Sequence, residues 1–136
     1  MAREIKKAKQ PYFLHMPDRM VFAFAGVMSR WKGLNDEPRV LTAAIITRAA
    51  EGAAADVHTR MPLILPKDAE AAWLDRGQVA GAKALEAAND AAVTAVELHA
   101  VSTRVNNSRN AGADLIEPFS NPDARGPHYI RGSSHE

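Results

Sequence analysis

The 136-residue chain contains no cysteine and no long hydrophobic run. Without cysteine the chain has no disulfide framework, thiolate zinc site or cysteine nucleophile, a composition typical of a reducing compartment. The longest uncharged apolar run covers residues 21–28, whereas a membrane-spanning helix needs about 20 apolar residues. No apolar signal-peptide segment follows the basic first residues. We therefore expect a cytoplasmic protein that does not contact a membrane.

A large excess of charge of either sign is also missing. Seventeen Lys and Arg against sixteen Asp and Glu give a formal charge of +1, so no global field draws the protein to nucleic acid. Any such binding has to be local. The basic start of the chain is interpreted as a solvated terminus. At 46% hydrophobic residues, a chain of this length suits one globular domain that buries roughly 70% of its unfolded surface.

Short apolar segments separated by turn residues organise the first half of the chain. Residues 11–16 and 20–28 flank Pro17-Asp18 and predict a β-hairpin. Residues 40–47 are short, β-branched and largely apolar, which predicts a buried strand. The Ala-rich residues 48–56 predict a brief helical turn.

Two helices and a strand are expected in the second half. The first helix begins at Pro66, has acidic residues in its first turn and ends at Gly77. Residues 79–88 predict a second helix. Residues 96–100 alternate between apolar and polar side chains, as in a strand with one wet face. The tail from residue 121 onward is rich in Pro, Gly, Ser and His, and we expect it to be loosely ordered.

Few motifs of known chemistry occur in the chain. The five histidines lack the i, i+4 spacing of a helical zinc site, so no metal site is expected. No nucleophile elbow surrounds the serines that could pair with His58, which are Ser29, Ser102 and Ser108. The eight glycines are scattered singly, so a phosphate-binding loop and a bound cofactor are not expected.

Two polar stretches stand out, "VHTRMP" at residues 57–62 and "VSTRVNNSRN" at residues 101–110. Guanidinium and amide groups at a strand end can hold phosphates or read a base edge. A structural alternative is open for both stretches. Asn106 and Asn107 would close turns in left-handed conformations, while His58 would cap a turn and Arg60 would pair with Asp56.

Taken together, the segments resemble the SOS response-associated peptidase (SRAP) family, whose members process abasic sites in DNA. The resemblance runs from residue 9 to residue 119. Its segments occur in the family's order and are "KQPYFLH", "FAFAGVMSRW", "AAIIT", "HTRMPLILP", "AWLD" and "VSTRVNNSRN" followed by "IEP". It implies an α+β fold with a β-barrel-like sheet flanked by short helices. Residues 1–120 would form the SRAP-like domain and residues 121–136 the tail.

The resemblance also implies a function in the response to DNA damage. Family members bind single-stranded DNA, capture abasic sites covalently through an N-terminal cysteine and process their own N-terminus as a peptidase. By match to the family motifs, His58 is the catalytic histidine and Arg60 contacts the DNA backbone. Thr47 lies near the catalytic pocket, and Asn106 and Asn107 shape it. Single-stranded DNA with an abasic site is thus the expected partner.

The start of the chain departs from the family pattern, because Ala2 and Arg3 follow Met1 where members have the cysteine. The family's catalytic glutamate also has no counterpart, so we expect a C-terminal portion of the fold that is inactive alone. Missing strands would expose apolar residues such as Phe22, Phe24 and Trp31 and favour self-association. The alternative is a non-catalytic fragment or degenerate relative that binds DNA weakly or assembles with another chain.

Overall fold

The computed structural model describes residues 9–35, 37–77 and 81–120. The expected loose tail and the basic start lie outside these residues. The strands are β1 (Tyr12–His15), β2 (Ala23–Phe24), β3 (Gly26–Trp31), β4 (Val40–Ile45), β5 (Thr47–Ala49), β6 (Arg60–Pro62), β7 (Ile64–Leu65) and β8 (Glu97–Ala100). The α-helices are α1 (Glu70–Leu74) and α2 (Gly81–Asp90), and the 3₁₀ helices are η1 (Gly52–Asp56), η2 (Lys67–Ala69), η3 (Thr103–Asn106) and η4 (Ala113–Ile116). This mixture confirms the α+β class.

The chain divides into two compact units. Residues 15–97 form what we call the central unit, and residues 1–14 with 98–136 form the terminal unit. The described strands form four two-stranded sheets, which are β1–β8, β2–β7, β3–β4 and β5–β6. The last three of these pairs are antiparallel.

The expected hairpin across Pro17-Asp18 is wrong, because β1 pairs with β8 and β2 pairs with β7. A turn is nevertheless present at this position, where the Arg19 amide donates to the Met16 carbonyl at 2.9 Å. The turn signal was therefore correct. The pairing was wrong because each flanking segment finds its partner far away in the sequence.

Three antiparallel pairs of the central unit meet at a ring of backbone hydrogen bonds. Ala25, Ile46 and Leu63 each lie between two consecutive strands. The Ala25 amide donates to the Leu63 carbonyl (2.8 Å), Leu63 donates to Ile46 (2.9 Å) and Ile46 donates to Ala25 (3.0 Å). Ala25 is 0% and Leu63 1% exposed, and Ile46 is half-buried, so two of the three members of the ring are fully shielded from water. It fixes the points from which β2–β7, β3–β4 and β5–β6 diverge.

The helices cover this junction. The core cluster consists of Ala25, Leu63, Leu65 and Ala88, with Ile46, Trp73 and Ala92 packed against it. Trp73 also donates its indole N–H to the Gly26 carbonyl at 3.1 Å, which attaches α1 to the start of β3. The helix expected from Pro66 is confirmed, although it ends at Leu74 and its first turn is the 3₁₀ helix η2. The second expected helix is confirmed as α2.

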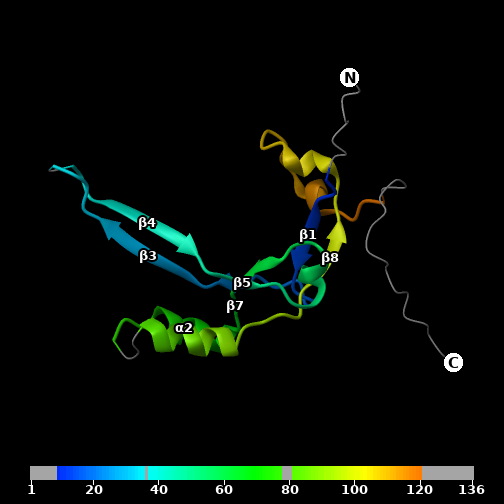
Figure 1. Cartoon of the computed structure of the whole chain (residues 1–136). Helices are drawn as coiled ribbons and strands as arrows, with labels where there is room; N and C mark the ends of the chain where they lie inside the picture. The colour runs from blue at the N-terminus through cyan, green and yellow to red at the C-terminus, as the bar shows by residue number, and fades with distance from the viewer. Residues whose placement is uncertain (1–8, 36, 78–80, 121–136) are drawn as a thin grey trace, which may run out of the picture. The chain divides into compact units, whose positions relative to one another are not determined.

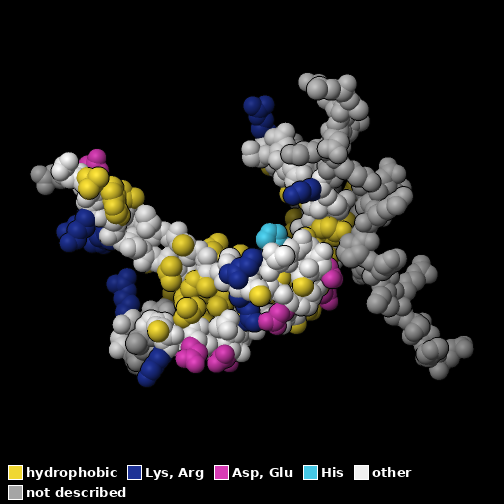
Figure 2. All heavy atoms as spheres, in the orientation of Figure 1, with side chains coloured by type: hydrophobic (Ala, Val, Ile, Leu, Met, Phe, Trp, Pro, Cys, Tyr) yellow, Lys and Arg dark blue, Asp and Glu magenta, His cyan; other side chains and the backbone are white. Residues whose placement is uncertain are grey.

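β3 and β4 form a two-stranded ribbon that Figure 1 shows as a long hairpin. Every residue of both strands is exposed, so the expectation of a buried strand over residues 40–47 is wrong. The composition correctly indicated an apolar strand, but no described element covers the ribbon. Its exposed apolar side chains, part of the hydrophobic surface in Figure 2, are Val27, Met28, Trp31, Val40, Leu41 and Ile45.

Phe24 (45%) and Trp31 (50%) are exposed as expected. Phe22 was also expected to be exposed but is half-buried. Its ring meets that of Phe24 edge-on, with the ring centroids 5.5 Å apart.

The terminal unit is built around the β1–β8 pair. The His99 ring donates from Nε2 to the Ile116 carbonyl at 2.7 Å and packs against Phe13. The expected strand over residues 96–100 is confirmed as β8, but His99 is half-buried and therefore does not lie on a wet face. Within the described residues, no helix has the length and apolar character needed to cross a membrane.

Candidate functional site

The stretch "VHTRMP" begins on an exposed turn after η1 and continues through β6, where Met61 is buried. Gly52 starts η1 with a φ of 59°, and a Cβ there would lie 3.1 Å from the Thr94 carbonyl oxygen. At the other end of η1, the amides of Val57 and His58 both donate to the Ala54 carbonyl at 3.1 Å. The helical turn expected over residues 48–56 is therefore confirmed only from Gly52 onward, since Arg48 and Ala49 belong to β5.

The β5–β6 pair brings Arg60 to Thr47. In the register of this pair, Ala49 lies opposite Arg60 and Thr47 opposite Pro62. Arg60 reaches along the pair, and its Nη2 donates to the Thr47 carbonyl (2.7 Å) and to Thr47 Oγ1 (2.8 Å). Arg60 therefore bonds to Thr47 and not to Asp56, its alternative partner.

Arg60 is exposed and keeps donors for a ligand. A guanidinium carries five N–H donors, and Thr47 occupies those of Nη2. The N–H groups of Nη1 and Nε have no acceptor among the described residues. Both bidentate faces of a guanidinium include Nη2, so the geometry favours a single-point contact to an anion through Nη1 or Nε.

His58 lies two residues before Arg60 and contacts its backbone. The Arg60 amide donates to His58 Nδ1 at 2.9 Å, and the Arg60 carbonyl oxygen lies 3.1 Å from the same nitrogen. The ring is exposed, and Nε2 has no hydrogen-bond partner among the described residues. His58 thus closes the turn through one nitrogen and leaves the other for a ligand.

Arg48 is a further residue of this region that the sequence did not indicate. Its Nη1 donates to the Asn89 carbonyl in the last turn of α2 at 3.1 Å, and its Nη2 forms an ion pair with Glu51. Only 18% of its side chain is exposed. A cation at a helix C-terminus satisfies unpaired carbonyls and complements the helix dipole. Arg48 therefore attaches β5, and with it Thr47, to α2.

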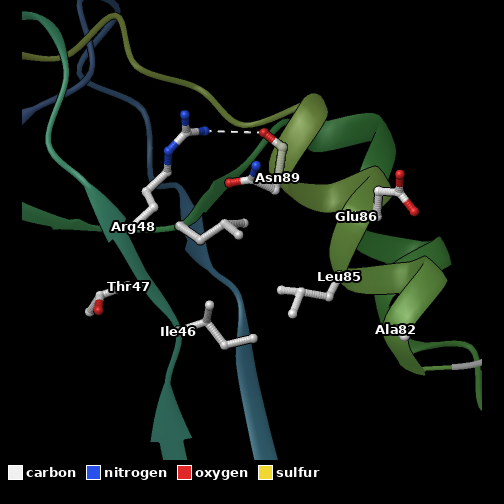
Figure 3. Close-up of a pocket in the computed structure, with 8 residues that line it drawn as sticks. Ile46, Thr47, Arg48, Ala82, Leu85, Glu86 and Asn89 are labelled. Carbon is white, nitrogen blue, oxygen red and sulfur yellow. Dashed lines mark hydrogen bonds between the residues drawn. The ribbon is translucent and has the colours of Figure 1, made fainter.

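A hollow of about 380 Å³ separates β5 from α2. Figure 3 shows Ile46 and Leu85 pointing toward one another, while Thr47 points away from the helix and Arg48 reaches Asn89. The lining residues are Ile46, Thr47, Arg48, Leu63, Ala82, Leu85, Glu86 and Asn89. Thr47 thus lines this hollow and also accepts the two hydrogen bonds from Arg60.

Asn106 and Asn107 lie in the terminal unit, at the end of η3. Asn107 Oδ1 accepts the Arg109 amide at 3.0 Å, and the Asn107 carbonyl accepts the Asn110 amide at 3.0 Å. Asn107 therefore closes a turn, as the structural alternative held, but with an ordinary φ of −106°. The Asn106 side chain is exposed and forms no hydrogen bond with a described residue.

Arg104 is fixed within the same loop. It forms an ion pair with Asp114, and its carbonyl accepts the Asn110 side-chain amide at 2.8 Å.

In the described ranges, no group of three or more His, Asp or Glu side chains is arranged to hold a metal ion. The chemistry of the candidate site is therefore that of exposed cationic and N–H donors, which suit an anionic or oxygen-rich ligand.

Comparison with known proteins relates these features to one family. The profile of the SOS response associated peptidase (SRAP) family matches residues 3–108. The abasic site processing protein YedK of Escherichia coli is 35% identical over 112 residues, which are 81% of this chain and 49% of YedK. The corresponding protein YoaM of Bacillus subtilis is 32% identical, covering 82% of this chain and 48% of YoaM. The chain thus spans about half the length of these bacterial relatives.

A vertebrate relative and a solved structure show the same similarity. The abasic site processing protein HMCES of Rattus norvegicus is 28% identical over 135 residues, which cover 81% of this chain and 37% of HMCES. A crystal structure of a Bacteroides thetaiotaomicron protein superposes with a TM-score of 0.65 at 21% identity. It covers 87% of this chain and 52% of the other, which shows a shared fold.

Proposed function

Because the chain belongs to the SOS response associated peptidase (SRAP) family, we propose that its exposed η1–β6 turn binds single-stranded DNA at an abasic site. Arg60 contacts a backbone phosphate, and His58 faces the lesion. The observation that carries the proposal is the Arg60 guanidinium, which two hydrogen bonds to Thr47 hold beside His58. An arginine held in this way loses less side-chain entropy when it meets a phosphate.

Asn106 and Asn107 belong to the terminal unit, and we propose them as separate contacts to the DNA. Asn107 shapes its loop through the turn that it closes, and the Asn106 amide is available to the sugar or the phosphate. Arg104 lies in the same loop and is engaged by Asp114, so we do not propose it as a phosphate contact.

Stable covalent capture is not part of the function that we propose for the 136-residue chain. Complete family members are expected to close a thiazolidine between an N-terminal cysteine and the ring-opened sugar, and this sequence has no cysteine. His58 then has no thiol to assist. The proposed function is recognition of the lesion without a stable crosslink, and peptidase self-processing is likewise not part of the proposal for these residues.

Binding to labelled oligonucleotides tests this proposal. Fluorescence anisotropy would compare a single strand that contains a tetrahydrofuran abasic analogue with the undamaged strand and with the duplex. We expect binding to both single strands, stronger than to the duplex, that weakens as salt rises. An absence of binding to single strands at low ionic strength would overturn the proposal.

A second candidate function, assembly with another chain, is favoured by the β3–β4 ribbon. All of its residues are exposed, and each strand is paired on one edge only among the described residues. Unpaired edges with apolar side chains are sites where a second strand adds. The same ribbon from a second copy of the chain is the simplest such partner.

A further inference from the structure

We infer that the backbone of Arg60 fixes the tautomer of His58, so that the neutral ring meets its ligand as an Nε2–H donor. Which ring nitrogen of His58 carries the proton follows from geometry alone. The identity of the ligand, an oxygen atom of the abasic sugar, rests on the proposed function.

The two backbone groups of Arg60 compete for the same ring nitrogen. The Arg60 amide lies 2.9 Å from His58 Nδ1 and can only donate, whereas the Arg60 carbonyl lies 3.1 Å from it and can only accept. If Nδ1 carried the proton of a neutral ring, its N–H would face the amide N–H at this short distance. If Nδ1 is unprotonated, it accepts the amide hydrogen at 2.9 Å, and the repulsion that remains is with the carbonyl oxygen at the longer distance of 3.1 Å. The neutral ring therefore carries its proton on Nε2.

The outward nitrogen then has a defined chemical character. Nε2 has no partner among the described residues, and the ring is exposed on the turn. A neutral Nε2–H donates a hydrogen bond and cannot accept a proton, because its lone pair belongs to the ring system. The resting histidine therefore suits an oxygen acceptor, such as the hydroxyl or carbonyl oxygen at C1′ of an abasic sugar. It does not present a general base to the lesion.

Protonation leaves the ring in the same position. In the imidazolium form Nδ1 carries a hydrogen, and the Arg60 carbonyl 3.1 Å away is positioned to accept it. Both protonation states are thus attached to one residue, and Nε2 stays directed outward in each. The Arg60 main chain is a positioning group for His58, in addition to the phosphate contact proposed for the Arg60 side chain.

Nitrogen NMR of the uniformly ¹⁵N-labelled chain tests the tautomer without any DNA. Spectra recorded at about pH 8.5, where an ordinary imidazole is neutral, distinguish protonated from unprotonated ring nitrogens. The His58→Gln variant lacks the ring-nitrogen signals of His58, so comparing its spectrum with that of the native chain assigns those signals. His15 supplies an internal reference for a protonated Nδ1, because its Nδ1 lies 2.8 Å from the Met16 carbonyl oxygen. We expect a protonated Nε2 and an unprotonated Nδ1 for His58. A protonated Nδ1 in His58 would overturn the inference.

Binding of a natural abasic site tests the donor role. The tetrahydrofuran analogue lacks the C1′ oxygen, so the native chain should bind the natural site about two- to tenfold more tightly, the value of one hydrogen bond. Gln retains an N–H donor near the position of Nε2, whereas Ala does not. We expect His58→Gln to keep part of this preference and His58→Ala to lose it. Equal loss in both variants would overturn the donor role, while failure of the native chain to bind either strand would overturn the proposed function instead.

Discussion

Among single residues, the proposed DNA contact depends on how Arg60 is held. Thr47 accepts two hydrogen bonds from Arg60 Nη2, one at its carbonyl and one at Oγ1. Thr47→Val removes the hydroxyl and keeps the carbonyl. Because a single hydrogen bond at an exposed site, open to competing water, contributes about 0.5 kcal/mol, we expect single-stranded DNA affinity to fall about twofold. Anisotropy measures this, and Thr59→Val is the matched control. An unchanged affinity in Thr47→Val would show that the hydroxyl does not position Arg60.

Ala25 provides a test of the hydrogen-bonded ring. Its side chain is 0% exposed, and its backbone donates to Leu63 and accepts from Ile46. Ala25→Leu adds three carbon atoms where no space exists, so we expect the free energy of unfolding to fall by about 1–3 kcal/mol. Denaturant melts measure the change, and Ala43→Leu on the exposed β4 strand is the control. If both variants melted alike, the ring would not be a tightly packed centre.

The site was predictable from the sequence where its residues are neighbours on one turn. His58 and Arg60 are two residues apart, and the resemblance to the family implied Thr47. Arg48 was missed because its partners, Glu51 and the Asn89 carbonyl, are recognised only once β5 lies beside α2. The backbone contact to His58 Nδ1 depends on the path of the turn, which a sequence pattern does not give.

At the scale of elements, the β3–β4 ribbon should make the chain self-associate. Ile45 and Leu41 lie on one face, opposite Gly26 and Arg30 in the partner strand, and both are about 60% exposed. Replacing both with Lys should reduce association, because charged side chains on a strand prevent another strand from pairing. Light scattering against protein concentration measures the effect.

A control on the opposite face distinguishes the two sides of the ribbon. Thr42 lies opposite Ser29 on that face. Thr42→Lys should change association less than the double substitution if the face that carries Met28, Leu41 and Ile45 is the contact. A native chain that remains monomeric at all concentrations would contradict the assembly proposal.

Elements with strong local signals were predicted well, and pairings were not. The helix from Pro66 and the helix that became α2 both form, because proline, acidic first-turn residues and apolar spacing act locally. The hairpin across Pro17-Asp18 was wrong because β2 pairs with β7, about forty residues away. The expected burial of residues 40–47 was also wrong, since β3 is the only described strand beside β4.

At the scale of the whole molecule, the composition predicts the outcome of crosslinking. Incubated with single-stranded DNA that contains a natural abasic site, the 136-residue chain should give no heat-resistant adduct, because it has no cysteine to close a thiazolidine. Lysine amines form imines that hydrolyse, so borohydride trapping is the control for engagement of the sugar. Denaturing gels measure the adduct. A band that resists heat and hydroxylamine without reduction would contradict this expectation.

The family and the α+β class were predictable because several short motifs occur in a fixed order over most of the chain. The division into a central and a terminal unit was not. It depends on which residues contact one another, and β1 joins β8 across more than eighty residues. Hydrophobic periodicity indicates that a strand is present, but it does not identify a partner so far away.

The salt dependence of DNA binding by Arg60→Ala shows whether Arg60 contacts a phosphate. Affinity for single-stranded DNA would be measured at two salt concentrations for the native chain, for Arg60→Ala and for Arg76→Ala, which removes an exposed arginine with no ion pair among the described residues. Loss of one phosphate contact should weaken binding to all sequences and reduce the slope of log K against log salt by about 0.7, roughly one counterion. His58→Ala should leave binding to undamaged strands unchanged. If Arg60→Ala kept the slope of log K against log salt that the native chain has, Arg60 would not contact a phosphate. An equally reduced slope in Arg76→Ala would show that the contact is not specific to Arg60.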